Sequence, residues 1–268
     1  MLTQEQCAHF DVFGFLVLRH VFGTDEMEAI IHEFEAAMLE DRDGVPFDGK
    51  KRQQVSDWFQ DRPTVQFMID GNQIRGPIEQ LLGTDYTFLD GNDGNFYVGD
   101  TLWHPDQGWA PQIPEGRDDP YRKAGNLTGH YERAIKVALY LDPVGRDTGC
   151  LRVIPGSHRG PYHEQLWSLH PEIPSASSRL PHVRPKMIEM WERDTGDLEG
   201  VEEFLIDPDA NHFGLEPCHV PGFALESQPG DAVFMDYQMW HASFGGRAGR
   251  RMFTLNYKAA QLNDDGGG

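Results

Sequence analysis

The chain has 268 residues, of which 39% are hydrophobic and 25% charged, and a formal net charge of −20. This length can bury one large β-rich core or two small ones, and the lack of a linker-like stretch favours a single domain over residues 1–268. The strong negative charge argues against nucleic acids and anionic membranes as partners. No apolar run approaches the roughly 18 residues of a membrane span, and no secretory signal is visible, so we expect a cytoplasmic protein.

The first forty residues predict two helices separated by a short strand. Thr3 can cap the first helix through a capping box, and Gly14 is expected to end it. The segment Phe15–Leu18 is typical of a strand, and Thr24 or Asp25 is expected to cap the second helix. The apolar residues of this second helix fall on one face at helical spacing: Met27, Ile30, Ile31, Phe34 and Met38.

The remainder predicts one further helix and then a strand-rich region. The helix is expected over Asp70–Leu82. Strands punctuated by Gly and Pro turns are expected within 134–142, 149–158, 222–236 and 250–259. Such a pattern, without intervening helices, indicates an antiparallel sandwich or barrel. Residues 159–220 interrupt it and contain a possible short helix over Pro185–Arg193, so we interpret this insertion as a lid over the functional site.

Two histidines and one aspartate are the residues most suggestive of chemistry. His104 and Asp106 lie two positions apart, so in an extended strand both side chains point to the same face while Trp103 points away. His241 could supply a third ligand from a distant strand. Two imidazoles and one carboxylate form the ligand set of non-haem Fe(II) oxygenases and leave other metal positions open. A His-x-Asp pair is also common as an ordinary turn or surface pair, so spacing alone does not decide.

An arginine near the C-terminus could bind the co-substrate that such an iron centre uses. A 2-oxo acid chelates the metal through its keto and carboxylate oxygens, and its far carboxylate suits the planar fork of a guanidinium. Arg250 and Arg251 begin a predicted strand and point to opposite faces. We favour Arg250, with Met252 and Thr254 on the same inward face, and keep Arg251 as the alternative.

The chain resembles the phytanoyl-CoA dioxygenase (PhyH-like) family of Fe(II)/2-oxoglutarate-dependent oxygenases. Five segments carry the resemblance, namely "LTQEQCAHFDVFGFLVL", "WHPDQ", "VALYLDPVGRDTGCLRVIPGSHRG", "QPGDAVFMDYQMWHAS" and "RRMFTLNY". The middle insertion and residues 40–95 match no motif of the family. The nine residues from His241 to Arg250 are slightly fewer than the family's usual spacing, which is why Arg251 stays open.

The resemblance implies a mainly β fold, with a double-stranded β-helix (jelly-roll, cupin-like) core flanked by N-terminal α-helices. It implies that His104, Asp106 and His241 are the catalytic iron ligands, that Arg250 binds 2-oxoglutarate, and that Fe(II), 2-oxoglutarate and O₂ are required. We place Thr254 in the same co-substrate site.

The expected reaction is hydroxylation of an unactivated C–H bond, with release of succinate and CO₂. Asp106 favours hydroxylation over halogenation, because a halogenating relative needs a small residue at that position. Desaturation, cyclisation or epimerisation use the same ligands, and a catalytically idle 2-oxoglutarate sensor or a Zn or Mn jelly-roll enzyme are the other readings. We expect a small free metabolite as substrate, because no basic cluster suggests a coenzyme A phosphate site. The sequence leaves the substrate's identity and the oligomeric state open.

Overall fold

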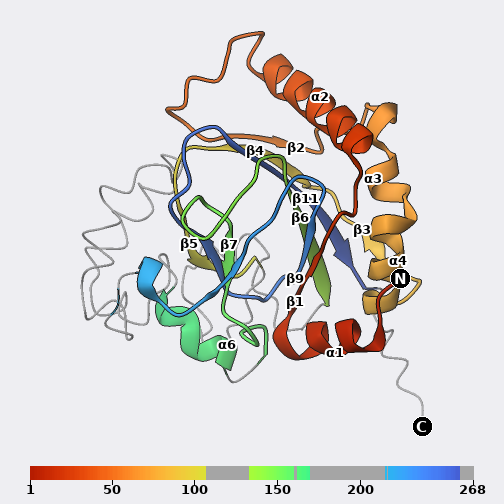
Figure 1. The fold of residues 1–268 in the computed structure, drawn as a ribbon. Helices are drawn as coiled ribbons and strands as arrows, with labels where there is room; N and C mark the ends of the chain where they lie inside the picture. The colour runs from red at the N-terminus through yellow and green to blue at the C-terminus, as the bar shows by residue number, and fades with distance from the viewer. Residues whose placement is uncertain (107–132, 160–161, 170–214, 216, 260–268) are drawn as a thin grey trace, which may run out of the picture.

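The computed structural model describes residues 1–106, 133–159, 162–169, 215 and 217–259. Within these residues the core is a pair of antiparallel sheets (Figure 1). The larger sheet has the order β1-β9-β6-β11-β4-β2, with β3 also pairing with β11. Its strands are β1 (Phe15–Leu18), β2 (Gln53–Ser56), β3 (Thr87–Phe88), β4 (Asp93–Tyr97), β6 (Ala134–Tyr140), β9 (Ala232–Asp236) and β11 (Arg250–Lys258).

The smaller sheet has the order β5-β10-β7-β8. Its strands are β5 (Thr101–His104), β7 (Leu151–Val153), β8 (Phe223–Leu225) and β10 (His241–Ser243). Two antiparallel sheets with helices at the N-terminus confirm the fold class expected from the sequence, a double-stranded β-helix with flanking helices.

The helices pack on one face of the larger sheet. They are α1 (Gln4–Phe13), α2 (Thr24–Asp41), η1 (Pro63–Val65), α3 (Phe67–Asp70) and α4 (Asn72–Leu82), and Figure 1 shows α2, α3 and α4 along one side of the molecule. Short helical turns follow β7 and precede β8, at α6 (Tyr162–Gln165), η2 (Leu166–Leu169) and η4 (Pro217–His219). No helix among the described residues is long and apolar enough to cross a membrane.

Alternation along the central strands separates the helix-facing core from the space between the sheets. On β6, Ile135, Val137 and Leu139 pack in the core shared with the helices. Ala138 and Tyr140 of the same strand pack instead in a second core with residues of the smaller sheet. The predicted two-residue periodicity therefore sorts β6 correctly and leaves Lys136 on the face that looks toward the smaller sheet.

The N-terminal helix follows its sequence signals closely. Thr3 forms the predicted capping box with Gln6, and Gly14 ends the helix in the left-handed conformation at φ 80°. The second helix begins one or two residues earlier than predicted, since Thr24 or Asp25 was the expected N-cap. Its N-cap is Gly23, whose backbone N–H donates to the Glu26 carboxylate. A glycine N-cap offers no side-chain acceptor, so this carboxylate supplies the polar contact at the helix start.

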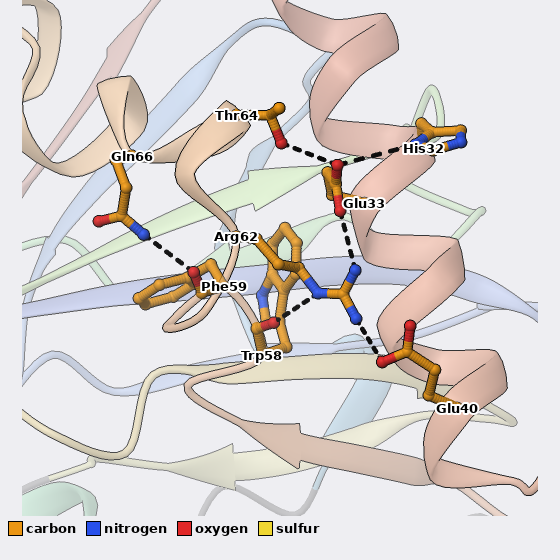
Figure 2. Close-up of polar contacts among 8 residues, drawn as sticks. All are labelled: His32, Glu33, Glu40, Trp58, Phe59, Arg62, Thr64 and Gln66. Atoms are coloured by element: carbon orange, nitrogen blue, oxygen red, sulfur yellow. Dashed lines mark hydrogen bonds and ion pairs between the residues drawn. The ribbon is translucent and has the colours of Figure 1, made fainter.

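Arg62 fastens α2 to the segment before η1 (Figure 2). Its Nη1 donates to Glu33 Oε2 at 2.8 Å and its Nη2 to Glu40 Oε2 at 2.5 Å. Its Nε donates to the Trp58 carbonyl oxygen at 3.1 Å. Glu33 and Glu40 lie two turns apart on one face of α2, so a single guanidinium bridges them and fixes the neighbouring segment against the helix.

Two further sequence predictions need correction, and two concern residues outside the described part. The helix expected over Asp70–Leu82 is split at Gly71, whose extended backbone (ψ 140°) separates α3 from α4. The strand carrying His104 ends at that residue, because Pro105 has no N–H to continue the ladder; Asp106 lies just beyond it. Most of the predicted lid, and all of the helix expected over Pro185–Arg193, lie outside the described residues.

Candidate metal and co-substrate site

A cavity of about 380 Å³ lies between the two sheets and is lined by residues of both. His104, Asp106 and His241 line it from the smaller sheet and its adjoining turn. Arg250 and Thr254 line it from β11 in the larger sheet. The cavity thus contains every residue that the sequence analysis singled out for metal and co-substrate binding, except the alternative Arg251.

Strand pairing brings the two histidines together. His104 on β5 and His241 on β10 are direct register partners, and their ring centroids are 4.3 Å apart. Asp106 is held beside them by its backbone N–H, which donates to the Tyr237 carbonyl oxygen at 3.0 Å. One side-chain ligand atom from each of the three residues lies within 4.8 Å of the others. This spacing suits three ligands around one metal ion.

Backbone carbonyls fix the orientation of both imidazoles. His104 Nδ1 is 2.6 Å from the Leu102 carbonyl oxygen, and His241 Nδ1 is 2.9 Å from that of Met239. A carbonyl oxygen only accepts, so each Nδ1 carries the proton and each Nε2 keeps its lone pair. Burial lowers the pKa of His241 to about 3, and burial also holds the pKa of His104 below its usual value. Both rings are therefore neutral near pH 7, as metal ligands must be.

The Asp106 carboxylate has two unlike oxygens. Oδ1 is 2.7 Å from the Lys136 ammonium. Oδ2 is buried, lacks a hydrogen-bond partner among the described residues, and lies 3.7 Å from His241 Nε2. Burial alone would raise the pKa of Asp106, but Lys136 and the two histidines hold it well below its ordinary value. An ionised, buried oxygen without a partner is costly, and a metal ion between it and the two Nε2 atoms would compensate it.

Arg250 is only 3% exposed and points into the cavity, whereas Arg251 points to the opposite face. The Nη1 of Arg250 donates to Gly149 O and Ser243 Oγ, both at 2.7 Å. Its guanidinium carbon lies 4.8 Å from the centre of the Tyr97 ring, and its Nε has no partner among the described residues. A buried cation with an unused donor suits a carboxylate ligand.

The neighbours of Arg250 include two residues that the sequence analysis missed. Ser243 lies two positions after His241 on β10, so the alternation of the strand places it on the same face and in the cavity. Gly149 has φ 88°, and a Cβ built there would lie 1.5 Å from Arg250 Nη1. The His-x-Ser spacing is a usable sequence signal. Gly149 and Arg250 are about a hundred residues apart in the sequence, so their contact leaves no sequence signal.

Thr254 lines the cavity two positions beyond Met252, as predicted, and its hydroxyl accepts a hydrogen bond of 3.3 Å from the Asp93 backbone N–H. The cavity wall formed by β2, β4 and the residue before β2 is polar, with Arg52, Gln54, Asp93 and Asn95 along it. Arg52 donates twice to the Asn95 side-chain oxygen, at 2.9 and 2.7 Å. This wall offers hydrogen bonds rather than an apolar surface.

The profile of a family described as Phytanoyl-CoA dioxygenase (PhyH) matches residues 10–252. No curated protein sequence matches significantly. Several solved structures are similar. HygX from Streptomyces hygroscopicus, solved with nickel and 2-oxoglutarate bound, has a TM-score of 0.62 at 18% identity, over 97% of this chain and 88% of that chain.

Two further solved structures show the same fold. SnoK, described as a non-heme alpha-ketoglutarate-dependent carbocyclase from nogalamycin biosynthesis, has a TM-score of 0.60 at 18% identity, over 99% of this chain and 89% of its own. EctD from S. alaskensis, in its apo form, has a TM-score of 0.55 at 18% identity, over 96% of this chain and 77% of its own. At such low identities these likenesses establish a shared fold.

Proposed function

The chain belongs to the phytanoyl-CoA dioxygenase family of Fe(II)/2-oxoglutarate-dependent oxygenases, and we propose that His104, Asp106 and His241 bind its Fe(II). The observation that carries this assignment is the convergence of the three ligand atoms within 4.8 Å of one another in a buried cavity. Both imidazoles present a free Nε2, and Asp106 presents a buried, unpartnered Oδ2. This is the two-histidine, one-carboxylate set that Fe(II) oxygenases use.

Arg250 is the proposed anchor for the far carboxylate of 2-oxoglutarate, with Ser243 and Thr254 beside it. The guanidinium is buried and held by Gly149 and Ser243, so it is oriented before the co-substrate arrives. Preorganised cations bind carboxylates with less loss of side-chain entropy than mobile ones. Arg251 does not serve this role, because its guanidinium pairs with Asp142 and Glu35 away from the cavity.

Bound Fe(II) would activate O₂, which is the oxidant; one oxygen atom would enter succinate as 2-oxoglutarate loses CO₂, and the other would be available for a substrate C–H bond. The protein's part is to hold the ligands and co-substrate and to exclude water from the buried cavity. Asp106 occupies the position that a halogenating enzyme leaves open, so hydroxylation is the proposed outcome.

The proposed substrate is a small, polar metabolite. The wall of Arg52, Gln54, Asp93 and Asn95 offers donors and acceptors of both charge signs, which favours a ligand with several hydrogen-bonding groups. A HygX structure with hygromycin B bound shows that this fold accommodates a small-molecule substrate or ligand. Cyclisation is the second candidate outcome, because SnoK is described as a carbocyclase and has a similar fold.

The test is succinate release by the Fe(II)-loaded protein with 2-oxoglutarate and O₂ across a library of polar metabolites. Turnover should be stimulated by a polar compound, and the product should gain one oxygen atom; loss of two hydrogens would indicate cyclisation or desaturation instead. His104→Ala should abolish Fe(II) binding and turnover, whereas His32→Ala, a change to a side chain that is 81% exposed, should leave both intact. Tight 2-oxoglutarate binding without succinate release under any condition would favour a sensor.

A further inference from the structure

We propose that Lys136 is a positioning residue that makes Asp106 bind iron through one oxygen only, an inference that rests on the proposed function. From the sequence alone, the alternation within residues 134–142 allows Lys136 either to meet a carboxylate or to lie at a sheet edge or on the surface. In the structure it lies on β6, which is interior to the larger sheet because it pairs with both β9 and β11. A lysine that faces inward from such a strand requires a compensating partner.

Asp106 is that partner. The Lys136 ammonium lies 2.7 Å from Asp106 Oδ1, and the two side chains are 20% and 17% exposed. The ammonium also lies 5.5 Å from the centre of the Tyr237 ring, and the Tyr237 carbonyl oxygen accepts the Asp106 N–H. Lys136 and Asp106 are therefore fixed relative to each other through Tyr237 as well as by their own ion pair.

The pairing divides the carboxylate into an occupied and a free oxygen. Oδ1 is engaged by a charge-assisted hydrogen bond, whereas Oδ2 is buried, unpartnered among the described residues and 3.7 Å from His241 Nε2. Rotation of the carboxylate toward two-oxygen chelation would break the contact with Lys136. In this arrangement the ion pair with Lys136 leaves Oδ2 to bind the metal and disfavours binding of the same metal by Oδ1.

One-oxygen binding matters because coordination positions are few. Three single-atom protein ligands leave three of six octahedral positions, enough for a chelating 2-oxo acid and O₂. A chelating carboxylate would occupy one of these. Removing Lys136 should therefore weaken 2-oxoglutarate binding. It should not weaken metal binding, because the same change removes a positive charge next to the cation and frees a second oxygen for it.

The variant Lys136→Met keeps an unbranched side chain that is one atom shorter and removes its charge. Calorimetry of the metal-free protein with Mn(II) should show affinity equal to or tighter than wild type. Anaerobic titration of the Fe(II)-loaded protein, followed by the visible charge-transfer absorption of chelated 2-oxoglutarate, should need roughly tenfold or more 2-oxoglutarate for half-saturation. Lys136→Arg, which keeps a cationic donor, should stay within about threefold of wild type. Lys50→Met makes the same charge change at a side chain that is 84% exposed and should match wild type.

The opposite pattern would overturn the proposal. A residue needed only for folding would lower the affinity for Mn(II) and leave the 2-oxoglutarate titration unchanged once metal is saturating. If Lys136→Met does not fold, Lys136→Gln is measured in the same way, and an unchanged 2-oxoglutarate titration in it equally refutes the role of Lys136. Wild-type protein that develops no charge-transfer absorption would refute the proposed function itself, so the two failures are distinct.

Discussion

Adjacent arginines on β11 have different surroundings because successive side chains of a strand point to opposite faces. Arg250 is buried in the cavity beside Ser243 and Gly149. Arg251 donates to Asp142 Oδ1 at 2.6 Å and to Glu35 Oε1 at 2.7 Å, so it joins the start of β11 to the loop after β6 and to α2. One arginine is suited to binding a ligand and the other to stabilising the fold.

Replacing each arginine by alanine should separate these roles. Arg250→Ala should raise the 2-oxoglutarate concentration needed for half-maximal succinate release by roughly ten- to a hundredfold, since hydrogen bonds between charged groups contribute about 1.5–3 kcal/mol. Arg251→Ala should leave that concentration unchanged and lower the free energy of unfolding by about 1–2 kcal/mol, because it removes a partly buried ion-pair network. Steady-state kinetics and urea denaturation measure the two quantities. The reverse pattern would place the co-substrate on the other face of the sheet.

For single residues, the sequence predicts which side chains face the cavity when the alternation within one strand decides their direction. The two-residue period places Arg250, Met252 and Thr254 on the cavity face, as the structure does. Lys136 and Gly149 act through contacts with distant strands, and one sequence contains no register between strands. Asp106 Oδ1 meets Lys136 only because Asp106 follows β5 and Lys136 lies inside the opposite sheet.

Among the helices, α2 is joined to the segment before η1 by the guanidinium of Arg62, and the Thr64 hydroxyl adds a hydrogen bond to Glu33. The Arg62 side chain is 16% exposed and Glu33 18%, whereas Glu40 is 69% exposed. The ion pair between Arg62 and Glu33 is thus shielded from solvent, and Arg62 also donates to the Trp58 carbonyl oxygen. The contacts of Arg62 with Glu33 and the Trp58 carbonyl should therefore contribute more to the free energy of unfolding than its contact with Glu40.

Arg62→Met should lower the free energy of unfolding by about 2–3 kcal/mol, because it leaves Glu33 Oε2 and the Trp58 carbonyl without their donor, although Thr64 still donates to Glu33 Oε1. Arg75→Met is the matched control. Arg75 pairs with Glu79 one turn away on α4, its side chain is 51% exposed, and the pair should contribute less than about 0.5 kcal/mol. Urea denaturation of both variants measures the difference; equal losses would show that the bridge to α2 adds nothing beyond an ordinary surface pair.

Element boundaries were predictable where the signal is local. The capping box at Thr3 and the left-handed Gly14 are encoded within a few residues, and both are confirmed. The break at Gly71 was missed because Asp70–Leu82 satisfies helical spacing throughout. In the folded chain a Cβ at Gly71 would lie 2.2 Å from the Phe67 carbonyl oxygen, so a close backbone approach, which the apolar pattern does not record, decides the boundary.

On the scale of the whole molecule, the turn after β7 contacts both the N-terminal helix and the residue before His241, because the Ser157 hydroxyl accepts a hydrogen bond from the Trp240 backbone N–H. His158 follows β7, is 6% exposed, and lies against the end of α1, with its Nε2 3.3 Å from the Asp11 carbonyl oxygen. Burial lowers the pKa of His158 to about 4, and the nearby charges of Arg159 and Arg133 lower it further against the Asp11 hydrogen bond. His158 is therefore neutral in the folded protein at pH values where it is already protonated in the unfolded chain.

The sign of the pH effect follows from this difference. Between the unfolded pKa of about 6.5 and the folded value of about 4, the unfolded chain binds one more proton at His158, so acidification favours unfolding. From about pH 7.5 to about pH 4.5 this residue alone should reduce the free energy of unfolding by about 2 kcal/mol.

His158→Gln should remove that part of the pH dependence, measured as the wild-type minus variant difference in urea denaturation of metal-free protein. The buried histidines His104 and His241, the proposed metal ligands, are common to both proteins, so their contributions cancel in that difference. His32→Gln removes a histidine that is exposed in the folded and unfolded chain alike and should leave the wild-type slope intact. Parallel pH profiles for wild type and His158→Gln would show that the turn after β7 does not couple the N-terminal helix to protonation.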